Sequence, residues 1–203
     1  IGSGASILNG ILGKSFNFDA FDISVFPEYY LYLQLAAVLT LSKEEYFEYF
    51  LSEDREVVFS DKYYDRLREN LPCEYKKFWD GLYNFNEGFE IYDSYLFRTD
   101  LYIKDVVIGN NPFLQDGNYD KLKNILKYDK VNINPVVADI IHTKFDKEYD
   151  LILLSNILAY HFRLDQMDEY FEYLDSNFRL KENGELIDFD FTPKRNEEKQ
   201  KRL

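Results

Sequence analysis

Hydrophobic and polar residues alternate between residues 16 and 22, a pattern typical of a β-strand that ends on an acidic residue. Before it, the apolar residues of positions 7–12 have the spacing of a helix, and Gly13 follows them as a helix stop. Residues 27–41 again place their apolar positions on one helical face and begin with proline, which is favoured in a first helical turn. The first 41 residues therefore predict a helix, a strand and a second helix.

The next part of the chain has a mostly helical pattern. Ser42 followed by Glu45 is a capping box, so we expect a helix from there to about residue 51. Further helical patterns occur around residues 62–70 and 73–81, and residues 103–108 (IKDVVI) have a strand pattern. The aromatic residues here suit either a lid over an apolar acceptor or a core between short helices. We expect residues 42–117 to form a mostly helical insertion.

Helix and strand patterns alternate again after residue 117. A helix is expected after Asn118, and another from Asp165 to about residue 178. Residues 149–154 (YDLILL) are a continuous apolar run, typical of a strand buried on both faces of a parallel sheet. Further strands are expected at residues 131–138 and 185–191, with a turn at residues 183–184.

This order of elements predicts an α/β fold with a mostly parallel, doubly wound sheet and a helical insertion after the second strand. Residues 1–41 and 118–191 would form the α/β domain, residues 42–117 the insertion or lid, and residues 192–203 a charged tail. A sheet of this type usually has further strands. We therefore expect ordered or native residues to be missing at one or both ends, or a partner chain to cover the sheet edge.

Composition restricts the partners of the chain. Its 37 acidic and 24 basic residues give a net charge of −13, which disfavours nucleic acid and anionic lipid headgroups. The one cysteine, Cys73, excludes an internal disulfide and agrees with a cytoplasmic location. With only two histidines beside it, no metal site is expected. No apolar run reaches the roughly 18 residues that a transmembrane helix needs.

Candidate binding residues follow the expected strands, because ligands of open α/β sheets bind beyond the carboxyl ends of the strands. Gly2-Ser3-Gly4 precedes a helix, where glycines let the backbone approach a ligand and the helix N-terminus favours a carboxylate. Asp22, with Ile23 beside it, comes about 20 residues later and is placed to accept both hydroxyls of a ribose. A structural turn and a helix-terminal charge are the alternative explanations of these residues.

Two further strand ends carry suitable groups. Asp139 and Ile140 pair an acid with an apolar neighbour that suits an adenine, and Ser155-Asn156 places small polar residues after the most buried strand. An exposed strand-end acid is the alternative for Asp139. The glycine pattern lacks the third glycine of a dinucleotide site. No phosphate-binding loop and no serine-hydrolase elbow is present in the sequence.

Several short segments together resemble one family of enzymes, the S-adenosylmethionine:diacylglycerol 3-amino-3-carboxypropyltransferases. The similar segments are DISVFP (residues 22–27), LYLQLAA (31–37), LSKEEYF (41–47), YDRLR (64–68), FWD (78–80), YDLI (149–152) and SNIL (155–158). The resemblance implies a Rossmann-like fold of the S-adenosylmethionine methyltransferase type. It also implies transfer of the 3-amino-3-carboxypropyl group of S-adenosylmethionine to a small-molecule or lipid hydroxyl, with methylthioadenosine as by-product.

The same resemblance assigns roles to the strand-end residues. Gly2, Ser3 and Gly4 would hold the methionine end of S-adenosylmethionine, Asp22 the ribose and Asp139 the adenine, and Ser155 and Asn156 would line the reaction side.

The reaction itself needs few groups, because the sulfonium of the cofactor is already activated. A hydroxyl acceptor also needs a base, and Tyr160 and His161, just after Ser155-Asn156, are the nearest catalytic candidates. A histidine with no catalytic role is the alternative for His161. Where the family has Asn-Pro after the acid, this chain has Ser24-Val25 and then Pro27. An ordinary methyltransferase and a non-catalytic binding protein therefore stay open as alternatives.

Overall fold

The structure is a computed structural model of the 203-residue chain, and it describes residues 4–94, 104–154 and 162–188. These residues belong to two compact units, which divide between Ala138 and Asp139.

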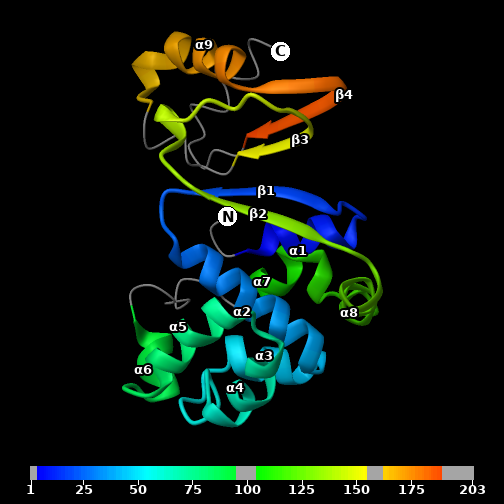
Figure 1. The fold of residues 1–203 in the computed structure, drawn as a ribbon, viewed down its shortest axis with the longest axis vertical. Coiled ribbons are helices and arrows are strands. Elements are labelled where there is room, and N and C mark those ends of the chain that lie inside the picture. The colour runs from blue at the N-terminus through cyan, green and yellow to red at the C-terminus, as the bar shows by residue number, and fades with distance from the viewer. Residues whose placement is uncertain (1–3, 95–103, 155–161, 189–203) are drawn as a thin grey trace. The chain divides into compact units, whose positions relative to one another are not determined.

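The first unit combines eight helices and two strands in its described residues, with two short 3₁₀ turns (Figure 1). In chain order they are α1 (Ala5–Leu12), β1 (Asn17–Asp22), α2 (Phe26–Thr40), α3 (Lys43–Leu51), α4 (Asp61–Leu67), η1 (Arg68–Asn70), α5 (Cys73–Tyr83), α6 (Gly88–Asp93), α7 (Lys104–Asn110), η2 (Pro112–Leu114), α8 (Asn118–Tyr128) and β2 (Asn132–Val137). β1 and β2 pair in parallel, with Phe18 opposite Ile133 and Asp22 opposite Val137. Both strands therefore end at the same edge of their sheet.

Local sequence signals explain several of these elements. The Ser42 hydroxyl accepts a hydrogen bond from the Glu45 backbone N–H, and the Glu45 carboxylate accepts one from the Ser42 N–H, which confirms the capping box of α3. Gly13 ends α1, and Pro27 lies in the first turn of α2, as expected. The strand expected at residues 103–108 is wrong, because α7 begins at Lys104. Short apolar runs fit a helix and a strand equally well.

Aromatic side chains form much of the core of the first unit. α2 lies at its centre, and residues 33–38 of this helix are all buried. Trp79 and Tyr49 are fully buried, and the Tyr49 ring stacks on that of Phe59 with 5.0 Å between centroids. Stacked and edge-on ring pairs of this kind add to the stabilisation that comes from the buried apolar area. The high content of Tyr and Phe is therefore largely used in packing.

The second unit contains a parallel strand pair and one α-helix in its described residues. Its elements are η3 (Ile140–His142), β3 (Glu148–Leu154), η5 (Leu164–Gln166), α9 (Met167–Asn177) and β4 (Arg179–Asp188). The turn expected at residues 183–184 lies inside β4 and does not end the strand. Asn183 has a φ of +63°, and the register with β3 shifts between Tyr149 and Leu151. The irregularity is accommodated within one long strand, as in a β-bulge.

The expected doubly wound sheet is wrong. The described residues contain two separate two-stranded parallel sheets, and no strand among them joins β1–β2 to β3–β4. One face of β1–β2 is polar at its start, where Asn132 donates to Asn17 and Asn134 to Asp19, both at 2.8 Å. A sheet covered by helices on both faces has apolar residues at such positions. Likewise, Leu151 on β3 remains 49% exposed.

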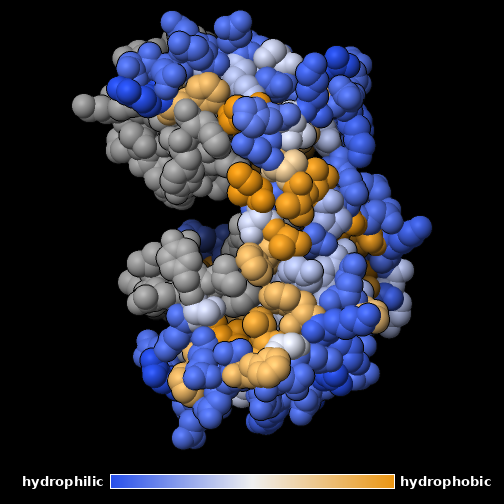
Figure 2. All heavy atoms as spheres, turned by 60° about the vertical axis from the view of Figure 1, so that its left-hand side comes forward, coloured by the Kyte–Doolittle hydropathy of each residue, from blue (hydrophilic) through white to orange (hydrophobic). Residues whose placement is uncertain are grey.

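Figure 2 shows a face on which hydrophilic residues predominate and hydrophobic residues emerge in smaller areas. Among the helices that the structure describes, none combines the length and the apolar character needed to cross a membrane.

Candidate functional site

The carboxyl edge of β1–β2 holds the most distinctive arrangement of predicted residues. Asp22 is the last residue of β1, and its carbonyl accepts a hydrogen bond of 3.0 Å from the Ala138 N–H, just after β2 ends. Its side-chain Oδ1 accepts from the Ser24 N–H at 2.9 Å, and the Ser24 hydroxyl accepts from the Phe26 N–H at 3.2 Å. These two turns lead into α2. They hold the Asp22 carboxylate at the strand end.

Large apolar side chains are exposed at this edge. Ile23 directly follows Asp22 and is 62% exposed, Val25 is 37% exposed, and Val137 at the end of β2 is 52% exposed. Burial of such side chains is normally favourable, so a group of them around a carboxylate is a feature to explain. We call Asp22, Ile23, Val25 and Val137 the strand-end edge. It offers a hydrogen-bond acceptor beside apolar surface.

α1 begins with a constrained glycine. The φ of Gly4 is +76°, and a Cβ at this position would lie 2.5 Å from Oε1 of Gln34 and 3.1 Å from Cδ1 of Leu31, both on α2. A side chain is therefore excluded by the backbone conformation and by space. α1 and β1 run in opposite directions in Figure 1, and Gly10 of α1 packs against Phe18 of β1. The start of α1 thus lies toward the end of the sheet at which β1 stops.

The remaining described candidates belong to the second unit. Asp139 caps η3 by accepting a hydrogen bond of 3.0 Å from the Ile141 N–H, and Ile140 is buried. The Ile140 carbonyl accepts a 2.6 Å hydrogen bond from the Tyr173 hydroxyl. Burial, and then the charge of Asp139, raise the pKa of Tyr173 to about 12, so this hydroxyl is protonated at neutral pH and acts as a donor.

The other candidates lie outside the described residues. They are Gly2, Ser3, Ser155, Asn156, Tyr160 and His161. Within the first unit, the structure therefore places Gly4, Asp22 and Ile23 of the predicted binding residues, and their roles stay predictions.

Gln34 was missed by sequence reasoning. It lies on α2 among apolar neighbours, is only 6% exposed, and faces Gly4. The signal was present in the segment LYLQLAA, where one amide interrupts a run of residues that all belong in a core. A polar residue at a buried helical position usually has a specific partner.

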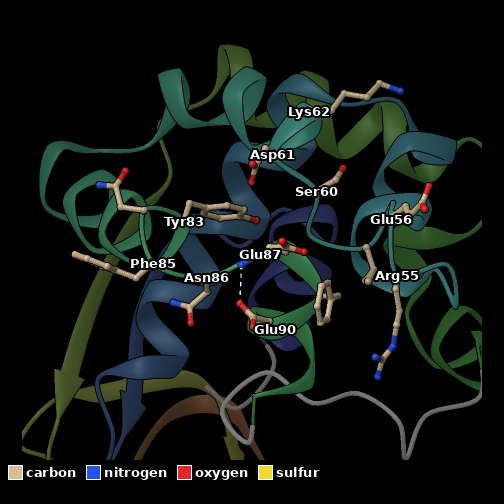
Figure 3. A pocket seen from close by; sticks show the side chains of 14 residues that line it. Arg55, Glu56, Ser60, Asp61, Lys62, Tyr83, Phe85, Asn86, Glu87 and Glu90 are labelled. Atoms are coloured by element: carbon tan, nitrogen blue, oxygen red, sulfur yellow. Dashed lines mark hydrogen bonds between the residues drawn. The ribbon is translucent and has the colours of Figure 1, made fainter.

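An open cavity of 730 Å³ lies elsewhere in the first unit, around α4, α5 and α6. Figure 3 shows that its labelled side chains come from several elements and do not converge on one point. Glu87 and Glu90 cap the start of α6, and the Tyr83 hydroxyl donates to the Phe59 carbonyl at 2.8 Å. These polar groups are engaged in holding the fold. None of the predicted site residues lines this cavity.

Metal binding has no support in the part of the chain that the structure describes, where no three His, Cys, Asp or Glu side chains are grouped to hold an ion. In comparisons with family models, with curated proteins and with solved structures, no match to this chain was found. The strand-end edge and the start of α1 are the parts of the first unit where predicted binding residues lie.

Proposed function

We propose that the chain is an S-adenosylmethionine-dependent transferase that moves the 3-amino-3-carboxypropyl group to the hydroxyl of a small-molecule or lipid acceptor. One observation carries the proposal. Asp22 ends a parallel strand beside the exposed Ile23, in the same unit as the glycine that begins α1. The short family-like segments around these residues support the same activity.

The residues fit the adenosine part of this cofactor. A ribose offers two neighbouring hydroxyl donors, and the Asp22 carboxylate is an acceptor held at the strand end by its bond from Ser24. Adenine is flat and largely apolar on its faces, and Ile23 offers exposed apolar surface beside that acceptor. Gly4 lets the start of α1 pack closely against Gln34 of α2, and the first turn of that helix offers backbone N–H donors. Donor, acceptor and apolar groups thus agree with the nucleoside.

In the proposed mechanism, S-adenosylmethionine supplies a carbon that its sulfonium has already activated. The chain would bind and orient it: Asp22 would hold the ribose, Ile23 would contact the base, and the start of α1 would hold the methionine end. Tyr160 or His161 would accept the proton of the acceptor hydroxyl, since deprotonation strengthens the attacking oxygen. Once aligned, that oxygen would form a bond to the carbon as the bond from this carbon to sulfur breaks, and methylthioadenosine would leave with the electron pair of the broken bond.

The test identifies the nucleoside by-product. The chain is incubated with S-adenosylmethionine and with diacylglycerol or small hydroxyl acceptors, and the nucleosides are separated by chromatography. Methylthioadenosine is expected. S-adenosylhomocysteine would instead indicate methyl transfer and overturn the aminocarboxypropyl proposal.

Binding gives a second measurement. Asp22→Asn is expected to weaken methylthioadenosine binding in calorimetry by about tenfold, the usual effect of weakening a hydrogen bond to a charged group. Asp19→Asn is the matched control, because Asp19 lies on the same strand and bonds Asn134 across the sheet. Equal binding by both variants and the wild type would contradict the role of Asp22.

A further inference from the structure

Gln34 carries an unsatisfied acceptor in the core of the first unit. Its Nε2 donates to the Tyr46 hydroxyl at 3.3 Å, while Oε1 is buried and has no hydrogen-bond partner among the described residues. A buried carbonyl oxygen without a donor is unfavourable, and native structures contain few of them. Its presence at one defined place therefore needs an explanation, and a bound donor is the simplest one.

The unsatisfied atom faces the start of α1. Oε1 of Gln34 is the nearest atom to the position that a Cβ of Gly4 would take, at 2.5 Å. Gly4 is the N-cap of α1 and offers no side chain to cap the helix. The backbone N–H groups of Ala5 and Ser6 have no carbonyl partner within the helix, as in any first turn. Donors of the helix and one acceptor of Gln34 thus occur side by side.

This pairing matches one chemical group. An α-amino acid end carries a carboxylate, which the N–H groups and dipole of a helix start favour, and an ammonium, which needs an acceptor a few ångströms away. We propose that Gln34 is a specificity-determining residue whose Oε1 accepts a hydrogen bond from the ammonium of the amino acid end of S-adenosylmethionine, while the first turn of α1 binds its carboxylate. This inference rests on the proposed function for the identity of the ligand.

A neutral amide suits this place better than a carboxylate. An ionised side chain at a site as buried as that of Gln34 would need a permanent partner to remain charged. The amide accepts the same hydrogen bond without that requirement. It also keeps its second contact, the hydrogen bond that Nε2 donates to the Tyr46 hydroxyl.

The experiment compares ligands with and without the amino acid end. Calorimetry is performed with S-adenosylhomocysteine, methylthioadenosine and L-methionine on the wild type, on Gln34→Met and on Tyr46→Phe. Methionine replaces the amide with an unbranched side chain of similar size that has no strong acceptor. Tyr46→Phe is the matched control, because it removes the neighbouring hydroxyl and keeps the amide.

In Gln34→Met, binding of S-adenosylhomocysteine is expected to weaken about tenfold to a hundredfold, as for loss of a hydrogen bond to a charged group. Binding of methylthioadenosine is expected to stay unchanged, which also shows that the variant is folded. Tyr46→Phe should change neither ligand by more than about threefold.

The failures are distinguishable. If the wild type binds both nucleosides and Gln34→Met weakens both equally or neither, the role of Gln34 is wrong and the proposed function stands. If the wild type binds neither nucleoside nor methionine, the proposed function and this inference both fall. If it binds L-methionine alone and loses it in Gln34→Met, the amino acid site stands and the nucleoside is wrong.

Discussion

Two regions of the first unit use their side chains in opposite ways. In α3–α6, which we call the aromatic region, buried polar atoms have partners: the Tyr49 and Tyr83 hydroxyls are 2.7 Å apart, and Trp79 Nε1 donates to the Tyr29 carbonyl at 3.2 Å. At the strand-end edge, by contrast, Ile23 and Val137 are more than half exposed. The aromatic region pairs its buried polar atoms within the fold, whereas the strand-end edge leaves large apolar side chains exposed.

The two regions should therefore affect different properties of the protein, the aromatic region its stability and the strand-end edge its binding. Tyr46, Tyr63, Tyr64 and Trp79 are each at most 3% exposed, so these rings form core between the short helices and do not line a lid surface. Burial, first of all, raises the pKa of Tyr46 and Tyr49 well above the ordinary value, which keeps both hydroxyls protonated and unsuited to act as bases. We therefore expect substitutions in the aromatic region to change stability, and those at the edge to change binding.

The largest expected effect is that of Trp79→Ala. The indole is fully buried and its N–H is bonded, so truncation leaves a cavity and removes the hydrogen bond to the Tyr29 carbonyl. The free energy of unfolding should fall by about 3–5 kcal/mol, as for other buried aromatic truncations. Urea unfolding followed by circular dichroism measures it.

The control is Phe85→Ala in the same region, because this ring is 88% exposed. Its unfolding free energy should change by less than about 0.5 kcal/mol. Equal losses for Trp79→Ala and Phe85→Ala would show that burial does not distinguish the two rings and would undo the assignment of the aromatic region to the core.

Sequence reasoning succeeded where the signal was local. The box of Ser42 and Glu45 uses atoms three residues apart, and the acid at the end of β1 follows directly from an alternating pattern. It failed where long-range pairing decides, because nothing in a strand pattern states which partner the strand will have. The continuous run of β3 predicted burial on both faces, yet Leu151 and Leu153 are 49% and 44% exposed. Two of the four residues of the strand-end edge, Val25 and Val137, were also missed, because their exposure depends on tertiary packing.

Two glycines allow the start of α1 to be tested against a neutral position. Gly4 and Gly117 are both helix N-caps, with φ of +76° and +74°. A Cβ on Gly117 would meet no atom within 4 Å, whereas one on Gly4 would clash with Gln34. Gly117→Ala should cost only the left-handed strain, about 1–2 kcal/mol, and Gly4→Ala should cost about 1–3 kcal/mol more through overpacking.

Denaturation of both variants gives this difference directly. A third variant, Gly4→Ala with Gln34→Ala, removes the nearest atom that the new methyl group would meet and leaves only the longer contact with Leu31. After the loss caused by Gln34→Ala alone is subtracted, the double variant should no longer show most of the extra unfolding free energy lost in Gly4→Ala. The reason is that residues in contact are energetically coupled. No recovery in the double variant would mean that Gln34 does not face Gly4 and would remove the geometric basis of the amino acid site.

Two aspartates provide the smallest and most direct comparison of the two regions. Asp80 in the aromatic region accepts three hydrogen bonds: from the Tyr64 hydroxyl at 2.7 Å, Arg68 Nε at 2.9 Å and Arg68 Nη2 at 2.6 Å. Asp80→Asn should lower the unfolding free energy at neutral pH by about 2 kcal/mol, as for hydrogen bonds to charged groups. Asp22→Asn should cost about 1 kcal/mol or less, because asparagine keeps the acceptor for Ser24.

The pH dependence shows whether charge causes the Asp80 effect. The hydrogen bonds from Arg68 hold the pKa of Asp80 below its ordinary value near 3.8, so the unfolded state binds the proton more readily than the folded state. The ion pair therefore stabilises the fold fully above the ordinary pKa, and this contribution is lost as the pH falls through the lowered one. Urea unfolding at several pH values should show the gap between wild type and Asp80→Asn constant from pH 7 to about 5 and narrowing below about 4. A gap of the same size at every pH would assign the loss to packing, and the aromatic region would then owe its stability to its rings alone.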